Sequence, residues 1–237
     1  QFKLLFPLAN YFMYSLNLND YDIVLSSSTT FGKYVKSIRG KHICYCYTPF
    51  RFLWDPQSYG INKKSVKYKF IKPFLSLFKK WDYEVSQGID YFIAMTDQMK
   101  IRIKKIYNRD SIVLPPPIES KKYSFSESNE NYFLVVSRHE PYKKVDLVIK
   151  AFNKLKLPLR VIGVGTMSDS LKNIAQENII FHGLVNESEL IDLYSKAIAL
   201  VFPQKEDYGL TPLEANASGK PVICYGFGGV ETTMVPY

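Results

Sequence analysis

Two cations and two glutamates in the second half of the chain have the types and spacing to form an anion-binding or sugar-binding site. Arg138 and Lys143 bracket the loop RHEPYK, which follows a predicted strand. A forked guanidinium and a compact ammonium at this spacing suit a diphosphate, although either cation alone is equally compatible with a solvated loop. Glu206 and Glu214 lie eight residues apart in a second loop, KEDYGLTPLE. Glu206 has no evident structural role there, whereas Glu214 also fits a helix cap.

The second loop leads into a predicted helix with a well-marked start. Thr211 as N-cap, Pro212 at the first helical position and Glu214 three residues after the cap form a capping box, and Gly219 ends the helix. In a parallel sheet such a helix N-terminus lies at the carboxyl ends of the strands, where its unpaired N–H groups and dipole favour an anion. We therefore expect a phosphate site within residues 202–229.

Strands and helices alternate throughout the second half, which predicts a doubly wound parallel sheet. The loops that leave its strands, the short glycine turn at 163–165 among them, would then meet at one edge of the sheet. That turn lacks the third glycine of a dinucleotide-binding fingerprint. The predicted strands cover 132–136, 159–162, 178–181, 199–202 and 222–225, and the predicted helices cover 144–155, 168–176, 187–195 and 212–218.

The first half is also predicted to be α/β. Pro49 and Pro56 argue against regular structure in TPFRFLWDP, so this segment is expected to form a loop after a strand. Three prolines at 115–117 and the polar stretch after them predict a domain boundary, which gives domains 1–118 and 119–237. The predicted strands cover 21–25, 42–47, 91–95 and 112–114, and the predicted helices lie within 1–20, over 31–38, over 65–86 with a break near Pro73, and over 97–107.

Composition narrows the class of protein. The hydrophobic content of 46% and aromatic content of 15% are typical of a globular protein. No apolar run approaches the roughly 20 residues of a membrane-spanning helix, so we expect a cytoplasmic protein. The three cysteines are predicted to be buried thiols, and the histidines at 42, 139 and 182 show no metal-ligand spacing.

The net charge of +9 is concentrated in the first half of the chain, where 18 Lys and Arg residues face 8 Asp and Glu residues. Residues 63–80, KKSVKYKFIKPFLSLFKK, interleave lysines with large apolar side chains. Two interpretations remain open for this stretch: a helix that packs its apolar side inward, or a segment that lies on an anionic membrane. No recognised nucleic-acid-binding module accompanies the charge, so no nucleic-acid partner is expected.

The second half resembles the family-four glycosyltransferases, which transfer sugars from nucleotide donors with retention and have the GT-B architecture of two Rossmann-like domains. Glu206 and Glu214 match that family's pair of glutamates separated by seven residues, and Arg138 and Lys143 match its cation spacing. In the first half, YTPFRFLWD resembles the acceptor-side motif of mannosyltransferase-like members that build surface polysaccharides. The chain is thus expected to be an α/β protein with two Rossmann-like, doubly wound domains, truncated at both ends.

The resemblance implies transfer of a hexose, with mannose as the first candidate, from a GDP- or UDP-linked donor to a glycan or lipid-linked acceptor at the inner face of the membrane. It implies no metal and no cofactor besides the donor. Catalytic roles fall to Glu206, Arg138 and Lys143. Glu206 would bind a sugar hydroxyl and Glu214 the ribose. The remaining implied donor-binding residues are Gly165, Tyr208, Gly209, Leu210 and Thr211, and the implied acceptor-side residues are Tyr47, Thr48, Arg51 and Asp55.

The sequence also departs from the family pattern at three places. Tyr47 stands where many relatives have histidine, Ser137 replaces a usual glycine, and Glu231 comes one residue earlier than is common. Tyrosine cannot supply the charge or the proton chemistry of histidine near neutral pH. The alternative hypothesis is therefore an inactive or fragmentary protein of the same fold that binds a nucleotide sugar.

Overall fold

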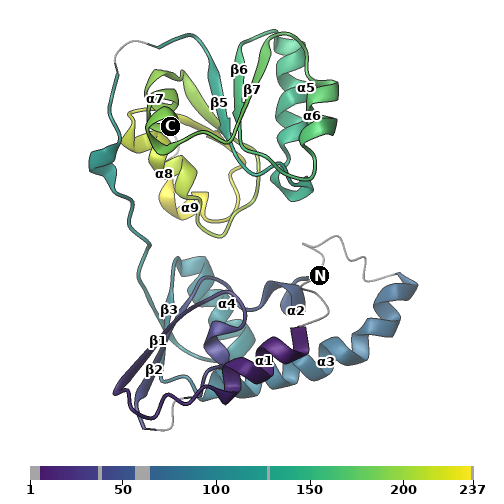
Figure 1. Cartoon of the computed structure of the whole chain (residues 1–237), viewed down its shortest axis with the longest axis vertical. Helices are drawn as coiled ribbons and strands as arrows, with labels where there is room; N and C mark the ends of the chain where they lie inside the picture. Colours follow the sequence, from purple (N-terminus) through teal and green to yellow (C-terminus); the bar gives the residue numbers. More distant parts are fainter. Residues whose placement is uncertain (1–5, 37–38, 57–64, 127–128, 236–237) are drawn as a thin grey trace. The chain divides into compact units, whose positions relative to one another are not determined.

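The computed structural model of the chain describes residues 6–36, 39–56, 65–126 and 129–235 (Figure 1). The chain divides into two compact units, Gln1–Pro116 and Pro117–Tyr237. Each unit contains one sheet whose described strands are all parallel. The predicted α/β class with Rossmann-like parallel sheets is confirmed.

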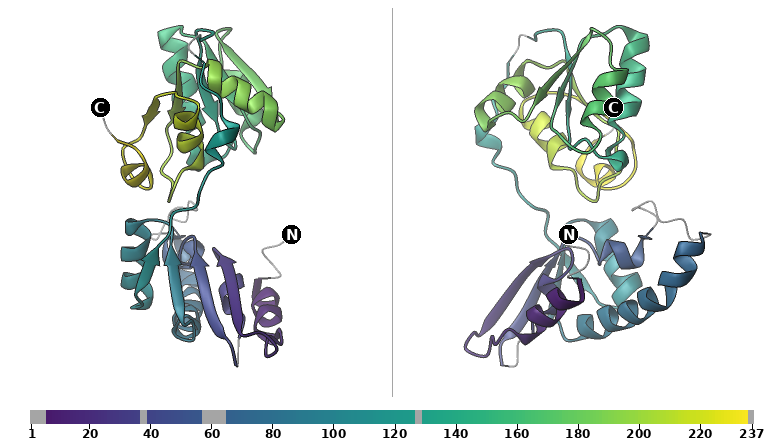
Figure 2. Two further views of the ribbon diagram at one scale, coloured as in Figure 1. Left: turned by 90° about the vertical axis from the view of Figure 1, so that its left-hand side faces the viewer. Right: turned by 45° about the vertical axis from the view of Figure 1, so that its right-hand side comes forward.

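The sheet of the first unit has its strands in sequential order, β1-β2-β3-β4. Because right-handed crossovers between sequential strands all pass on the same side, the helices gather on one face of this sheet (Figure 2). The opposite face is open to solvent, with Leu25, Tyr91 and Ile112 more than half exposed. The strands are β1 (Ile23–Ser28), β2 (Lys41–Cys46), β3 (Tyr91–Ala94) and β4 (Ser111–Val113), and the helices are α1 (Phe6–Ser15), η2 (Gly32–Tyr34), α2 (Arg51–Trp54), α3 (Val66–Gln87) and α4 (Asp97–Tyr107).

A buried ion pair connects the helices of the first unit. The Lys33 ammonium lies 2.8 Å from the Asp82 carboxylate, and both side chains are almost completely buried. Tyr34, Tyr107 and the Trp54 indole each donate a hydrogen bond to the same carboxylate, over 2.6 to 2.8 Å. Burial and the neighbouring carboxylate raise the pKa of Tyr34 and Tyr107 far above the ordinary value, so both remain donors. The network fixes α2, the element that follows β2, against α3 and α4.

The strands of the second unit are arranged in the order β7-β6-β5-β8-β9, so the strand order reverses in the middle of the sheet while all strands stay parallel. α5 and α6 pack with one hydrophobic cluster on one face of the sheet, and α7 and α8 pack with a second cluster on the other. This sheet is therefore doubly wound. Its strands are β5 (Phe133–Val136), β6 (Leu159–Ile162), β7 (Ile179–Gly183), β8 (Ala199–Phe202) and β9 (Val222–Cys224), and its helices are η4 (Ser120–Lys122), η5 (Pro141–Lys143), α5 (Val145–Leu155), α6 (Ser168–Ile174), α7 (Glu187–Lys196), α8 (Leu210–Ala217) and α9 (Val230–Thr233).

Three predictions for the first unit are wrong in detail. α3 runs without a break through Pro73, because its inward side chains are held in a tertiary cluster. TPFRFLWDP contains the one-turn helix α2. Of the helix predicted over 31–38 only a 3-10 turn forms, because Lys33 and Tyr34 enter the buried network instead; residues 37 and 38 lie outside the described part, as do residues 1–5 of the predicted first helix.

The cysteines occur as free thiols. Cys44 and Cys46 are fully buried, as predicted, while Cys224 is only partly buried. The remaining strands and helices of both units lie within a few residues of their predicted positions.

Candidate functional site

The candidate site lies where the second sheet reverses its strand order. β5 and β8 are neighbours, and the connections that leave their carboxyl ends turn to opposite faces of the sheet, which is the usual place for a ligand in an open α/β sheet. Lys143 comes from η5 after β5, and Glu206 comes from the loop after β8. The Lys143 ammonium forms an ion pair with the Glu206 carboxylate, and their side chains are only 13% and 23% exposed. The structure thus brings two of the three predicted catalytic residues into contact.

Arg138, the third predicted catalytic residue, lies in the same loop as Lys143. Its guanidinium is exposed and donates a hydrogen bond of 2.8 Å to the Tyr142 hydroxyl. The Lys143 ammonium lies 5.3 Å from the centre of the Tyr142 ring. Tyr142 therefore holds both cations on one short loop, a role that the sequence analysis did not assign to it.

The glycine turn after β6 packs directly against this cation loop. Gly163 has a φ of +118°, and a Cβ atom there would overlap the carbonyl oxygen of Ser137. A Cβ atom at Gly165 would overlap the backbone of His139 in the same way. The glycines thus permit two loops to touch backbone to backbone. That Gly165 also contacts the donor remains a prediction.

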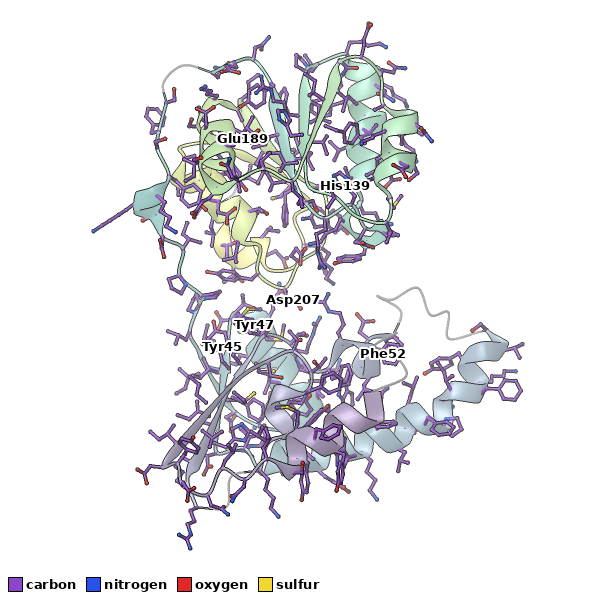
Figure 3. The ribbon with its side chains drawn as sticks, in the orientation of Figure 1. Tyr45, Tyr47, Phe52, His139, Glu189 and Asp207 are labelled. Carbon is purple, nitrogen blue, oxygen red and sulfur yellow. The ribbon has the colours of Figure 1, made fainter. Side chains whose placement is uncertain are left out.

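His139 and Ser168 fasten the two loops together. The Ser168 hydroxyl accepts a hydrogen bond of 2.9 Å from the Gly165 N–H and lies 3.0 Å from His139 Nδ1. The His139 side chain is buried at the base of the cation loop (Figure 3). Burial, with a smaller contribution from Lys172, lowers the pKa of His139, so the imidazole is neutral at physiological pH. Its role in this structure is to position the loop.

The start of α8 differs from the predicted capping box. The N-cap is Gly209, with φ +90°, and no side chain caps the helix. Leu210 is the first helical residue, so Thr211 and Pro212 follow within the first turn. Pro212 is tolerated there because the first N–H groups of a helix have no intrahelical partner. The phosphate site predicted at this helix N-terminus would therefore use backbone groups that begin two residues earlier than expected.

Glu214 is held by tyrosines instead of capping α8. The Tyr194 hydroxyl, from α7, donates a hydrogen bond of 2.9 Å to the Glu214 carboxylate. Burial and then Glu214 raise the pKa of Tyr194 well above its ordinary value, and the same causes in the same order raise that of Tyr123 to about 12. Both hydroxyls therefore stay protonated and able to donate. The sequence contained no signal for these contacts, because Tyr123 and Tyr194 come from separate segments of the chain.

The turn after β9 supports the backbone of Glu206. Gly229 donates a hydrogen bond of 2.7 Å to the Glu206 carbonyl, and Gly228 forms an isolated parallel bridge with the same residue. Gly228 has a φ of +99°, and a Cβ atom at Gly229 would overlap the backbone of Tyr208. Tyr208 is itself buried, so this close backbone contact lies away from solvent.

The predicted acceptor-side residues lie together after β2 in the first unit. The Tyr47 hydroxyl accepts a hydrogen bond of 3.1 Å from Ser27, and the Tyr45 and Tyr47 rings meet edge to face 5.2 Å apart (Figure 3). Thr48 is buried, while Arg51 begins α2 and the exposed Asp55 follows its end. Their place at the carboxyl end of a parallel strand is suited to binding, but their roles remain predictions.

Within the described residues, no three His, Cys, Asp or Glu side chains are grouped so that they could hold a metal ion. Over the same residues, no helix is long and apolar enough to cross a membrane.

Comparison with known proteins identifies the second unit. The profile of the family described as "Glycosyl transferases group 1" matches residues 118–237. The O-antigen chain mannosyltransferase RfbU of Salmonella typhimurium is 31% identical over 145 residues, which cover 56% of this chain and 41% of that protein.

Solved structures share the fold across nearly the whole chain. Sucrose-phosphate synthase from Thermosynechococcus elongatus aligns with a TM-score of 0.74 at 15% identity, covering 99% of this chain and 64% of that one. HepE from Anabaena, solved with UDP and glucose, aligns with a TM-score of 0.71 at 16% identity and covers 98% and 65%. The chain therefore spans less than two thirds of the length of each of these three proteins.

Proposed function

The chain belongs to the group 1 glycosyl transferases, and on that premise we propose that it binds a nucleoside-diphosphate sugar in its second unit and transfers the hexose with retention. The observation that carries this proposal is the meeting of Lys143 and Glu206 where the strand order reverses. One loop thus supplies positive charge for a diphosphate, and the other supplies an acceptor for sugar hydroxyls.

In the proposed reaction the charge on the donor diphosphate grows as the glycosidic bond breaks. Lys143 and Arg138 stabilise that charge, and the backbone N–H groups at the start of α8 are proposed to assist them. Glu206 accepts a hydrogen bond from a hydroxyl of the sugar and orients it. With a diphosphate as leaving group, no carboxylate has to attack. The acceptor hydroxyl attacks the oxocarbenium-like ion from the face that the diphosphate leaves and gives its proton to a diphosphate oxygen, so the configuration is retained. In this mechanism the residues need no metal ion.

We further propose mannose as the sugar and a glycan or lipid-linked acceptor, on the strength of the similarity to an O-antigen chain mannosyltransferase. Tyr47, Thr48, Arg51 and Asp55 are the proposed acceptor-side residues. Assembly of such acceptors at the inner face of the membrane would make this a cytoplasmic, peripheral enzyme.

A second candidate function is binding of the nucleotide sugar without transfer. The observation that favours it is Tyr47, whose hydroxyl is already engaged by Ser27 and which stands where many relatives have histidine. Replacing this residue by histidine (Tyr47→His) separates the two candidates. Transfer that appears only in the variant supports the binding protein, and transfer by the unaltered chain refutes it.

Transfer of labelled hexose from a panel of GDP- and UDP-sugars tests the proposed activity. Glu206→Ala removes the acceptor of the sugar hydroxyl and is expected to lower the rate about 100-fold, the usual loss for one catalytic hydrogen-bonding group. Glu177→Ala, at an exposed position outside the site, is the matched control and is expected to leave the rate unchanged. Equal rates in both variants would contradict the role of Glu206.

A further inference from the structure

The first half of α3 carries more apolar surface than the fold of the unit uses. Its inward side chains Ile71, Leu75 and Phe78 pack in a hydrophobic cluster with α2 and η2. Phe70, Phe74 and Leu77 belong to none of the described clusters of the unit and are 77%, 67% and 66% exposed. Inward packing therefore accounts for only part of the apolar content of this stretch.

The exposed apolar residues form a stripe along one side of the helix. Each of Val66, Phe70, Pro73, Phe74 and Leu77 has another member of the set three or four residues away, so the five residues lie on one face of the helix. We call these five residues the α3 stripe. The amino-terminal turns of α3, which bear it, extend beyond the sheet of the unit (Figures 1 and 2).

Lysines accompany the α3 stripe. Residues 66–80 contain five lysines and no acidic residue, and Lys69, Lys72 and Lys80 are exposed. A helix with a solvent-facing apolar stripe and lysines beside it fits the boundary between lipid headgroups and acyl chains, where the apolar residues enter and the lysines meet anionic headgroups. A protein partner would satisfy the apolar side chains but would need a matching acidic surface as well.

We propose that the α3 stripe, with Lys69 and Lys80 beside it, docks the first unit onto the surface of an anionic lipid bilayer. The stripe enters the headgroup region with α3 lying in the plane of the surface. This docking rests on no feature of the donor site, so it can hold whether or not the proposed transfer occurs.

Cosedimentation of the chain with lipid vesicles tests the proposal. The chain is expected to bind vesicles of phosphatidylcholine mixed with phosphatidylglycerol, and to bind pure phosphatidylcholine vesicles much less. The variant K69Q/K80Q is expected to weaken binding to the anionic vesicles about 30-fold, since each lysine near such a surface contributes about 1 kcal/mol. Added salt is expected to weaken binding of the unaltered chain in the same direction.

The apolar contribution is tested by F70S/F74S, which is expected to lower the partition coefficient about tenfold or more. Ile101→Ser is the matched control, because Ile101 is 66% exposed on α4 of the same unit, and it should bind like the unaltered chain. Three outcomes would overturn the proposal: no preference for anionic vesicles, equal binding by F70S/F74S and the control, or a stable dimer that F70S/F74S dissociates without any vesicle binding. Because the readout is vesicle binding, a chain that docks but transfers no sugar would refute only the proposed function.

Discussion

Lys143 carries a charge for which two groups compete in the proposed reaction. In the described structure its ammonium is paired with the Glu206 carboxylate. A donor diphosphate would bring more negative charge to the same ammonium and would leave Glu206 to accept a hydrogen bond from the sugar. The pair keeps both side chains oriented. In the proposed reaction, donor binding would give each of them a new partner.

Glu214 has an uncharged partner, because its carboxylate accepts a hydrogen bond from the Tyr194 hydroxyl. Tyr194→Phe removes this hydrogen bond and is expected to lower the free energy of unfolding by about 1–2 kcal/mol, because Tyr194 is buried and its carboxylate partner loses a donor. Urea denaturation of the variant measures the loss. Tyr225→Phe, at a tyrosine that is 57% exposed, should change stability little. Equal stabilities of the two variants would show that the hydroxyl contributes nothing.

The residue-level predictions from sequence succeeded where the parallel-sheet pattern itself brings two loops together, and failed where a complete local motif was overridden by a tertiary contact. The proximity of Lys143 and Glu206 follows from two strands whose ends meet at one sheet edge, which the alternation of elements already indicated. The contacts of Glu214 do not follow, because the capping-box pattern Thr211–Glu214 is locally complete and competes with a tyrosine on another helix. In the structure Glu214 forms the tertiary contact with Tyr194 and does not cap α8.

At the scale of elements, the site depends on loops that approach one another more closely than side chains would permit. Gly163 combines a positive φ with direct contact to the Ser137 carbonyl, whereas Gly183 has a positive φ of +69° and open space around it. Gly163→Ala is expected to lower the free energy of unfolding by at least about 3 kcal/mol, because its Cβ atom would overlap the Ser137 carbonyl oxygen in addition to the strain of a positive φ. Gly183→Ala is expected to cost only about 1–2 kcal/mol, the left-handed strain alone. Denaturant unfolding compares them, and similar costs would contradict the close loop contact.

The link between His139 and Ser168 predicts a pH dependence of stability. The folded-state pKa of His139 is lowered by burial and Lys172, so the folded protein resists protonation while the unfolded chain accepts a proton near pH 6.5. The contribution of His139 is therefore complete above about pH 6.5 and is lost as pH falls from there towards the folded-state pKa. Urea unfolding at pH 7 and pH 5 should show a smaller acid loss in His139→Asn than in the unaltered chain. Equal acid losses would contradict the lowered pKa.

Element positions were predictable from sequence because short apolar runs alternate with amphipathic segments. What the pattern could not predict was the use of single residues. The sequence predicted a helix at Lys33 and Tyr34, but both side chains instead contact Asp82 in the buried network. Pro73 stays inside α3 because the inward side chains of that helix pack in a hydrophobic cluster. Both differences depend on contacts with distant parts of the chain, such as that of Tyr34 with Asp82 48 residues away, which the local sequence pattern does not indicate.

At the scale of the whole molecule, the two sheets are built differently although both are parallel. The sequential order β1-β2-β3-β4 leaves one face of the first sheet open, whereas the second sheet has helices on both faces and reverses its strand order between β5 and β8. The donor site is therefore proposed in the second unit, and the docking surface is proposed in the first.

The most direct test of the account is thermal unfolding of the chain with GDP, UDP or ADP, compared with the variants Lys143→Ala and Arg138→Ala. A nucleotide at about 100 times its dissociation constant stabilises the folded state by about 2.7 kcal/mol. The account predicts that at least one of GDP and UDP raises the unfolding temperature of the unaltered chain, and that either variant loses most of this rise. A response to none of the nucleotides, or an undiminished response in both variants, would contradict a donor site built on these two cations.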